Sequence, residues 1–292
     1  EAVEDAEKKE DITPEQSDIP ATNFHITDDE LGQGTPKEKF RANIMAIQLL
    51  KKCEEENRNA TPDEQEILSR YVGWGGLADA FDETKSAWET EYLELKTVLT
   101  PEEYAAARAS TLNAHYTQPI VIESMYQALE NLGFTKGNIL EPSMGVGNFF
   151  GMLPEKLNQS KLYGVELDSI SGRIAKLLYP DANIQIKGFE KTDYPNDFFD
   201  VAIGNVPFGA YKVNDRQYDR YNFMIHDYFL AKTIDQLRPG GVAWIKHHRK
   251  SESIWQNVPI SLEPSACRTQ HSKQMQERKS VQIFYSSRSV TA

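Results

Sequence analysis

Apolar residues recur at helical spacing in the first part of the chain. Between positions 35 and 70, four of them lie three or four positions apart: Phe40, Ile44, Ile47 and Leu50. This spacing predicts amphipathic helices, and a second helical stretch is predicted from about 86 to 110. Thr-Pro-Asp-Glu at 61–64 and Thr-Pro-Glu-Glu at 100–103 are typical helix starts. We therefore expect a helical N-terminal region over residues 23–110.

From Gly137 onward, short apolar runs alternate with helical patterns. Strands are expected at 138–141, 162–166, 184–186, 199–203 and after the Pro-Gly-Gly at 239–241, and helices at 169–178 and 223–237. Such alternation is typical of an α/β fold with a doubly wound, mainly parallel sheet. In this Rossmann-like class, ligands bind at the carboxyl ends of the strands. We expect such a domain over residues 111–246.

Charge and composition indicate which kinds of partner this protein can have. The formal net charge is -12, but the first 20 residues hold eight acidic groups against two lysines, so this segment supplies half of it. Residues 1–22 are predicted to be a disordered acidic tail, and the remainder is compatible with a nucleic-acid partner. No apolar run is long enough for a membrane span, and two cysteines give no zinc spacing. A cytoplasmic protein without a membrane or metal partner is expected.

Two features point to an adenosine-containing ligand. A glycine-rich loop, Pro-Ser-Met-Gly-Val-Gly-Asn-Phe at 142–149, directly follows the first predicted strand and precedes a predicted helix. Phe150 stands where the dinucleotide motif requires its third glycine, which argues against a nicotinamide cofactor. Glu166 ends the second strand, where a carboxylate can accept hydrogen bonds from both hydroxyls of a ribose.

The fourth strand runs into Asn-Val-Pro-Phe-Gly at 205–209. A carboxamide oxygen, a backbone carbonyl beside proline and an aromatic ring would lie together at the sheet edge. Two acceptors can polarise an exocyclic amine while the ring stacks on a planar base, and these are the requirements of transfer to that amine. The other interpretation is an ordinary turn, because proline and glycine are common turn formers.

Residues from about 112 to 245 resemble the N-6 adenine DNA methyltransferases that use S-adenosylmethionine. The family's motifs occur in order at 114–119, 141–149, 166, 188–190 and 205–208. From Phe24 onward, the chain resembles more narrowly the methyltransferase-like region of large helicase/methylase proteins of conjugative elements and phages. Val206 departs from the pattern, because the family has proline there.

The resemblance implies S-adenosylmethionine as cofactor, adenine-containing DNA as substrate, and a larger parent protein with further domains such as a helicase. No metal is implied, because the sulfonium is already an activated methyl donor. Asn205 and Pro207 would orient the target amine, and Phe208 would stack on an extruded adenine. The implied cofactor-binding residues are Tyr116, Thr117, Glu141, Pro142, Gly145, Gly147, Asn148, Phe149, Glu166 and Glu190.

Two other functions stay open. One is a catalytically inactive methyltransferase-like module that binds DNA or protein, which the departure at Val206 favours. The other is methylation of a glutamine side chain in a protein, since a similar loop acts on that amide nitrogen. Three cations near the loop, Lys212, Arg216 and Arg220, alternate with tyrosines and indicate either a DNA contact or a solvated loop partly neutralised by Asp215 and Asp219.

Residues 247–292 do not continue the sheet pattern, since they contain one leucine and nine serines. Back-translation of 266–286 in a shifted frame permits a string, LPNTAFKANAGTEVSSDILF, that resembles the family's continuation. We therefore predict an atypical, out-of-frame tail, with a natural divergent extension as the alternative. With an out-of-frame tail, the sheet is expected to keep an exposed edge after the strand that begins near Gly241.

Overall fold

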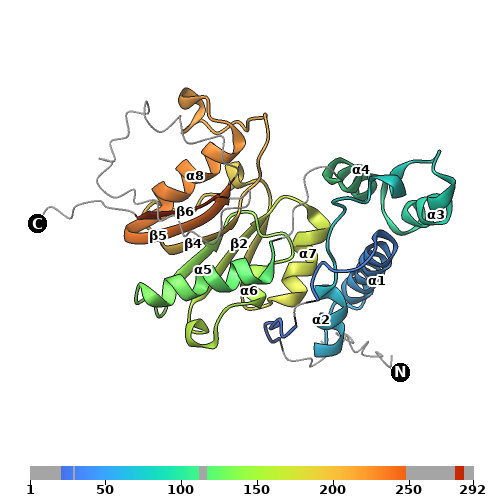
Figure 1. The fold of residues 1–292 in the computed structure, drawn as a ribbon, viewed down its shortest axis with the longest axis horizontal. Helices are drawn as coiled ribbons and strands as arrows, with labels where there is room; N and C mark the ends of the chain where they lie inside the picture. Colours follow the sequence, from blue (N-terminus) through green and yellow to red (C-terminus); the bar gives the residue numbers. More distant parts are fainter. Residues whose placement is uncertain (1–20, 29, 112–116, 248–279, 286–292) are drawn as a thin grey trace, which may run out of the picture.

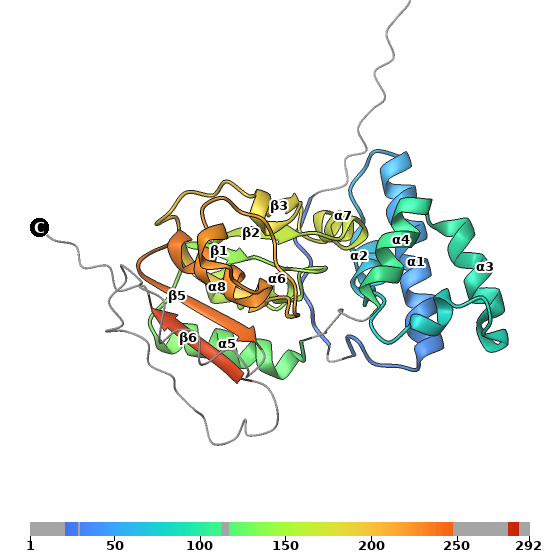
Figure 2. The ribbon, with the colours of Figure 1, turned by 90° about the horizontal axis from the view of Figure 1, so that it is seen from above.

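The computed structural model describes residues 21–28, 30–111, 117–247 and 280–285, and its N-terminal part is helical, as expected (Figure 1). Figures 1 and 2 both place these helices beside the sheet. The predicted tail at 1–22 lies almost wholly outside the described residues. The elements of this region are α1 (Pro36–Glu55), α2 (Pro62–Ser69), the 3-10 turns η1 (Ala78–Phe81) and η2 (Ser86–Trp88), α3 (Glu89–Val98) and α4 (Pro101–Ser110).

The same four-residue pattern, Thr-Pro-x-Glu, starts three of these helices. In each, the threonine side chain accepts a hydrogen bond from the backbone N–H of the glutamate, whose carboxylate accepts the threonine N–H. Proline occupies the first turn, where its missing N–H costs nothing. The predicted starts at 61 and 100 are therefore confirmed, and Thr35 with Glu38 forms a third capping box.

The second region is a six-stranded sheet in the order β3-β2-β1-β4-β5-β6. The first five strands are parallel and β6 runs antiparallel to β5. This order confirms the predicted α/β, doubly wound, mainly parallel sheet of the Rossmann-like class. The strands are β1 (Asn138–Glu141), β2 (Lys161–Glu166), β3 (Asn183–Ile186), β4 (Phe199–Asn205), β5 (Leu237–His247) and β6 (Ser280–Tyr285).

Helices cover both faces of the sheet (Figure 2). On β1, Ile139 points to a core shared with α5 (Pro119–Asn131), α7 (Ser169–Leu178) and the N-terminal helices, whereas Leu140 points to a core shared with α8 (Ile225–Gln236). Opposite burial of neighbouring residues follows from the two-residue period of a strand. The shared first core ties the helical region to one face of the sheet.

Three helical features of the second region differ from or refine the sequence interpretation. The helix α5, which the sequence interpretation did not include, buries Ile122, Met125, Tyr126 and Leu129 against the sheet. The helix expected after the glycine-rich loop is a single turn, α6 (Asn148–Gly151). The expected helix at 169–178 has those bounds, and α8 begins two residues later than expected.

Polar contacts fix the helical region to α7. Arg173 donates to Glu54 at 2.7 Å and to Glu103 at 2.7 Å, so one guanidinium joins α7 to both α1 and α4. Gln65 donates to the carbonyl of Leu177 at 3.0 Å. Because α7 directly follows the strand that carries Glu166, the helical region is held next to the carboxyl edge of β2.

The edge of β5 that was expected to be exposed is paired: Val281 to Tyr285 lie in β6, opposite Lys246 to Val242. That expectation was therefore wrong, because the one apolar stretch of the tail supplies a strand. Residues 248–279 and 286–292 lie outside the described residues. The shifted reading frame of 247–292 stays a proposal, and the nucleotide sequence across these codons tests it.

The described residues show neither a membrane-spanning helix nor a cluster of metal-ligating side chains. Within the described ranges, no helix combines the length and apolarity that crossing a membrane requires. In the same part of the chain, no three His, Cys, Asp or Glu side chains gather closely enough to hold a metal ion.

Candidate functional site at the carboxyl edge of the sheet

The topology brings three predicted site residues to one edge. From β1 the chain winds outward through β2 and β3, whereas β4 and β5 lie on its other side, so the winding direction changes between β1 and β4. Glu141 ends β1, Glu166 ends β2 and Asn205 ends β4. A Cβ on Gly204 would lie 3.4 Å from Cγ of Glu141, so the ends of β1 and β4 are in contact. Doubly wound sheets bind ligands at this switch point.

Glu166 holds the turns that follow β1 and β2. Its carboxylate accepts the backbone N–H of Gly145 at 2.7 Å and that of Asp168 at 2.7 Å. Burial of the carboxyl group raises its pKa to about 7, although these two hydrogen bonds favour the ionised form. The side chain is still partly exposed, and an ionised carboxylate has about four lone-pair sites, so acceptor capacity remains for a ligand.

Glu141 is more deeply buried, with 2% of its surface exposed. Its Oε2 finds no hydrogen-bond donor among the described residues. Burial first, and then the nearby Glu166 carboxylate, raises its pKa well above the ordinary value. A buried oxygen without a partner is costly in a folded chain, so this edge offers an acceptor that a ligand donor would satisfy.

The glycine-rich loop uses its glycines in two ways. Gly145 has φ +57°, and a Cβ there would meet nothing within 4 Å, so the loop surface is open at this point. Gly147 has φ +83°, and a Cβ would lie 2.6 Å from the Tyr179 ring, so only glycine fits. Pro142 and Phe149 are buried, and the Phe149 carbonyl accepts the Tyr126 hydroxyl at 2.7 Å. The ring of Phe149 therefore supports the loop from the core side.

The loop after β4 exposes part of Asn205, Pro207 and Phe208 at the same edge. Val206 alone turns inward and is 1% exposed, packed in the core shared with α8. The residue that departs from the family pattern is thus a core residue. Its burial directs the flanking side chains away from the core.

The remaining predicted positions differ in placement. Thr117 is 6% exposed beside the start of α5, and Tyr116 lies outside the described residues. Asn148 is partly exposed in the first turn of α6. Glu190 follows β3 in the turn η4 (Phe189–Lys191), and its carboxylate folds over Gly188, where a Cβ would lie 2.2 Å from Oε1.

The sequence analysis missed Leu167, which directly follows Glu166 and is 75% exposed. An exposed leucine is unremarkable by itself, but this one adjoins a carboxylate at the switch point. An apolar side chain at that place can cover one face of a planar ring. The sequence feature that could have identified Leu167 was its position, one residue beyond the predicted end of the second strand.

A buried lysine supports the loops of this edge and was also missed. Lys232 of α8, 6% exposed, donates to the carbonyl of Phe189 at 2.8 Å and to Oδ2 of Asp215 at 3.1 Å. Tyr228 donates to the same Oδ2 at 2.7 Å. Burial lowers the pKa of Lys232, and Asp215 opposes that shift. One ammonium group therefore joins η4 to the segment that follows the Asn205 loop.

The pKa of Glu166 gives a pH-dependent stability. The folded value of about 7 lies above the ordinary 4.5, so between these values the folded chain holds a proton that the unfolded chain has lost. Stability in the absence of ligand should therefore fall as the pH rises through this window. We expect the Glu166→Gln variant to lose part of that slope in thermal unfolding at a series of pH values.

The control for this experiment is Glu89→Gln, which removes an exposed carboxylate of α3. This variant shows how much of the pH dependence of stability comes from general repulsion between carboxylates, which grows as an acidic chain ionises. If Glu166→Gln and Glu89→Gln keep the same slope as the parent chain, Glu166 does not titrate in this range.

A curated phage protein is similar to this chain in sequence. No protein-family model matches the chain. The chain is 30% identical over 220 residues to the "Defense against restriction protein B" of Escherichia phage P1, a match covering 72% of this chain and 8% of that protein. The chain thus corresponds to a small part of its relative.

Solved methyltransferase structures show a general likeness. A putative class I S-adenosylmethionine-dependent methyltransferase from Listeria monocytogenes matches with TM-score 0.45 and 15% identity, covering 88% of this chain and 89% of that one. A putative rRNA methylase from Clostridium thermocellum matches with TM-score 0.37 and 13% identity, covering 56% and 96%. The TM-scores are low, and the Rossmann-like class follows here from the strand order itself.

Proposed function

We propose that this chain binds S-adenosylmethionine at the carboxyl edge of its sheet and methylates the exocyclic amine of adenine in DNA. The observation that carries the proposal is the meeting of Glu141, Glu166 and the Asn205 loop at the switch point. The parent would be a larger mobile-element protein with further domains such as a helicase. The phage relative supports this, because the match covers only 8% of it.

The side chains at the edge fit such a cofactor. The free lone pairs of Glu166 would accept the two ribose hydroxyls, and Leu167 would cover a face of the adenine. The unpartnered Oε2 of Glu141 would accept a hydrogen bond from the amino group of the methionine part. Gly145 leaves room for close approach of the ligand. When bound, the cofactor would supply an activated methyl group.

The loop after β4 would bind and orient the target base. The Asn205 carboxamide oxygen and the carbonyl beside Pro207 would accept the two amine hydrogens, which raises the electron density on nitrogen. Phe208 would stack on the extruded adenine. Holding the amine and the methyl group in line would contribute to the rate enhancement, because reactants held in an aligned geometry lose less entropy on reaching the transition state.

The segment after this loop would contact the DNA backbone. Asp215, expected from the sequence to neutralise nearby cations, is directed to Lys232 and Tyr228 instead. Arg216 and Arg220 are exposed on the same segment, and Arg220 lies 4.6 Å from the centre of the Tyr221 ring. Exposed cations beside aromatic rings are the usual surface for a nucleic-acid strand.

The competing function is a module that binds without catalysis. Val206 favours it, because valine lacks the ring that stiffens the loop in the family. Methylation of a protein amide nitrogen is the other alternative, and both are distinguished by the same assay.

The test is transfer of a labelled methyl group from S-adenosylmethionine to adenine-rich DNA, to the same DNA without adenine, and to protein substrates. We expect label only in the adenine-containing DNA, released as N-6-methyladenine on digestion. Label in protein alone would mean that the substrate is a protein amide nitrogen and not adenine in DNA. Retained cofactor binding without label in any substrate would favour the non-catalytic module.

A further inference from the structure

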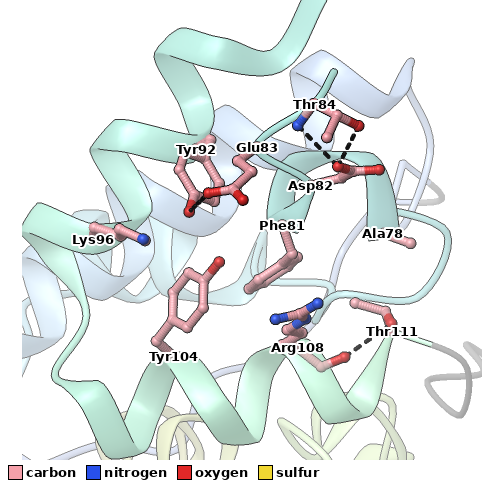
Figure 3. A pocket seen from close by; sticks show the side chains of 10 residues that line it. All are labelled: Ala78, Phe81, Asp82, Glu83, Thr84, Tyr92, Lys96, Tyr104, Arg108 and Thr111. Carbon is pink, nitrogen blue, oxygen red and sulfur yellow. Dashed lines mark hydrogen bonds between the residues drawn. The ribbon is translucent and has the colours of Figure 1, made fainter. Parts of the chain in front are cut away.

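A separate cavity of about 530 Å³ lies in the helical region, between η1, α3 and α4 (Figure 3). Its volume falls within the range of about 300–1,000 Å³ that small-molecule sites usually have. None of its residues belongs to the sheet edge described above. Its lining residues are Ala78, Phe81, Asp82, Glu83, Thr84, Tyr92, Lys96, Tyr104, Arg108 and Thr111.

Aromatic rings line the cavity. The ring centres of Phe81 and Tyr104 lie 5.3 Å apart, and the Lys96 ammonium lies 4.5 Å from the centre of the Tyr92 ring. Tyr92 and Tyr104 are partly exposed, so ring surface remains open to a ligand. Figure 3 shows Lys96 pointing toward the space between these two tyrosines. Such open ring faces are suited to stacking with a planar group.

The charged groups are separated within the cavity. Figure 3 shows Asp82 and Thr84 at one end, and Tyr104 and Arg108 at the other. Asp82 accepts the N–H and the hydroxyl of Thr84, at 2.9 and 2.7 Å, and Glu83 accepts the Tyr92 hydroxyl at 3.3 Å. Both carboxylates are therefore hydrogen-bonded to neighbouring groups. The pKa of Asp82 is lowered, first by its hydrogen bonds to Thr84 and to a smaller extent by the charges of Lys85 and Arg108.

The two cations of the cavity differ from most basic side chains of the helical region. Six basic side chains there form ion pairs with carboxylates: Lys37, Arg41, Lys51, Arg58, Arg70 and Lys85. No described carboxylate pairs with Lys96 or Arg108 within 4.0 Å, although acidic residues outnumber basic ones in the chain. Both side chains are exposed, so their positive charges are accessible to an anion.

We propose that this cavity binds a nucleoside monophosphate unit, with its phosphate at Arg108 and Lys96 and its base against the tyrosine rings. The bidentate geometry of a guanidinium suits a phosphate, and each base offers a π-face for stacking. This unit occurs in a free nucleotide and in a DNA strand. Only the strand source rests on the proposed function, as a second contact of the substrate DNA.

The test is calorimetric titration of the whole chain, without S-adenosylmethionine, with three probes: dAMP, deoxyribose 5-phosphate and a single-stranded hexanucleotide. We expect dAMP to bind at least tenfold more tightly than deoxyribose 5-phosphate, because only dAMP has a base to stack. Arg108→Gln should weaken dAMP binding about tenfold. Its melting temperature should stay unchanged, since Arg108 is exposed.

Two control variants define the site. Lys52→Gln removes an exposed charge from the same region, outside the cavity, and should change dAMP affinity less than twofold. Glu166→Ala should leave dAMP binding unchanged, which separates this cavity from the proposed adenosine site. Because S-adenosylmethionine is titrated separately, failure of the proposed function and failure of this cavity give different results.

The outcomes assign the source or overturn the proposal. Tenfold tighter binding of the hexanucleotide than of dAMP places the site on a DNA strand, and equal or weaker binding indicates a free nucleotide. Absence of binding for dAMP and the hexanucleotide, equal affinity for dAMP and deoxyribose 5-phosphate, or equal losses in Arg108→Gln and Lys52→Gln would each overturn it.

Discussion

Replacing Asn205 by alanine is expected to lower methyl transfer to DNA by a factor of about 10²–10³, the usual effect of removing one positioned polar group from a reacting centre. The carboxamide would act on the target amine and not on the cofactor. We therefore expect the affinity for S-adenosylmethionine to change less than twofold. Single-turnover transfer of labelled methyl groups, with calorimetry on the same samples, measures both quantities.

Asn214→Ala is the matched control for this variant. Asn214 is exposed on the segment that follows the same loop, so the substitution removes an identical group outside the proposed reacting centre. If Asn205→Ala keeps the parent rate, or loses it no more than Asn214→Ala does, the role assigned to Asn205 is wrong.

Replacing Lys232 by methionine should destabilise the chain by about 2–4 kcal/mol, because it leaves a partly buried Asp215 carboxylate and the Phe189 carbonyl without their cation. For a chain of this size, the melting temperature should fall by roughly 5–10 °C. Thermal and urea unfolding measure the change. Methionine keeps most of the side-chain volume, so the loss reports the charge.

Lys191→Met supplies the control, since Lys191 is an exposed lysine in the adjacent turn η4. It should shift stability by less than about 0.5 kcal/mol. The double variant Lys232→Met with Asp215→Asn should recover part of the loss, because the unpaired charge is removed. A Lys232→Met chain as stable as Lys191→Met would mean that the ion pair does not hold these loops.

Local sequence rules predicted much of this fold. The starts at Thr61 and Thr100 were predictable because a capping box joins groups only three residues apart. The doubly wound, mainly parallel sheet followed from the alternation of strand and helix patterns along the chain. The helix α5 also carried a readable pattern, with Ile122, Met125 and Leu129 at helical spacing after a proline.

Other features depend on contacts between distant residues. Lys232 and Asp215 are 17 residues apart, and no periodicity marks a lysine that will be buried. For the same reason the sequence indicated that Asp215 would neutralise neighbouring cations, whereas the structure directs it to α8. The position of Glu166 was predictable, but its hydrogen bond to the Gly145 N–H depends on how two strand ends meet.

The cavity lined by Tyr104 and Arg108 shows a similar limit. Its residues come from η1, α3, α4 and the segments that follow η1 and α4, and the pattern of each stretch alone indicates only a helix or a turn. Unlike most basic side chains of this region, Arg108 has no described carboxylate partner within 4.0 Å, and this becomes visible only when the helices are assembled.

Calorimetric titration of S-adenosylmethionine into the chain, compared with its Glu166→Ala and Glu102→Ala variants, examines the proposed site most directly. A ligand held by Glu166 should bind the parent chain and Glu102→Ala equally, because Glu102 is an exposed carboxylate of α4. Binding to Glu166→Ala should be at least tenfold weaker, the loss expected for a hydrogen bond to a charged group. No heat of binding from the folded parent chain, or equal affinity in all three, would contradict a cofactor site at this edge.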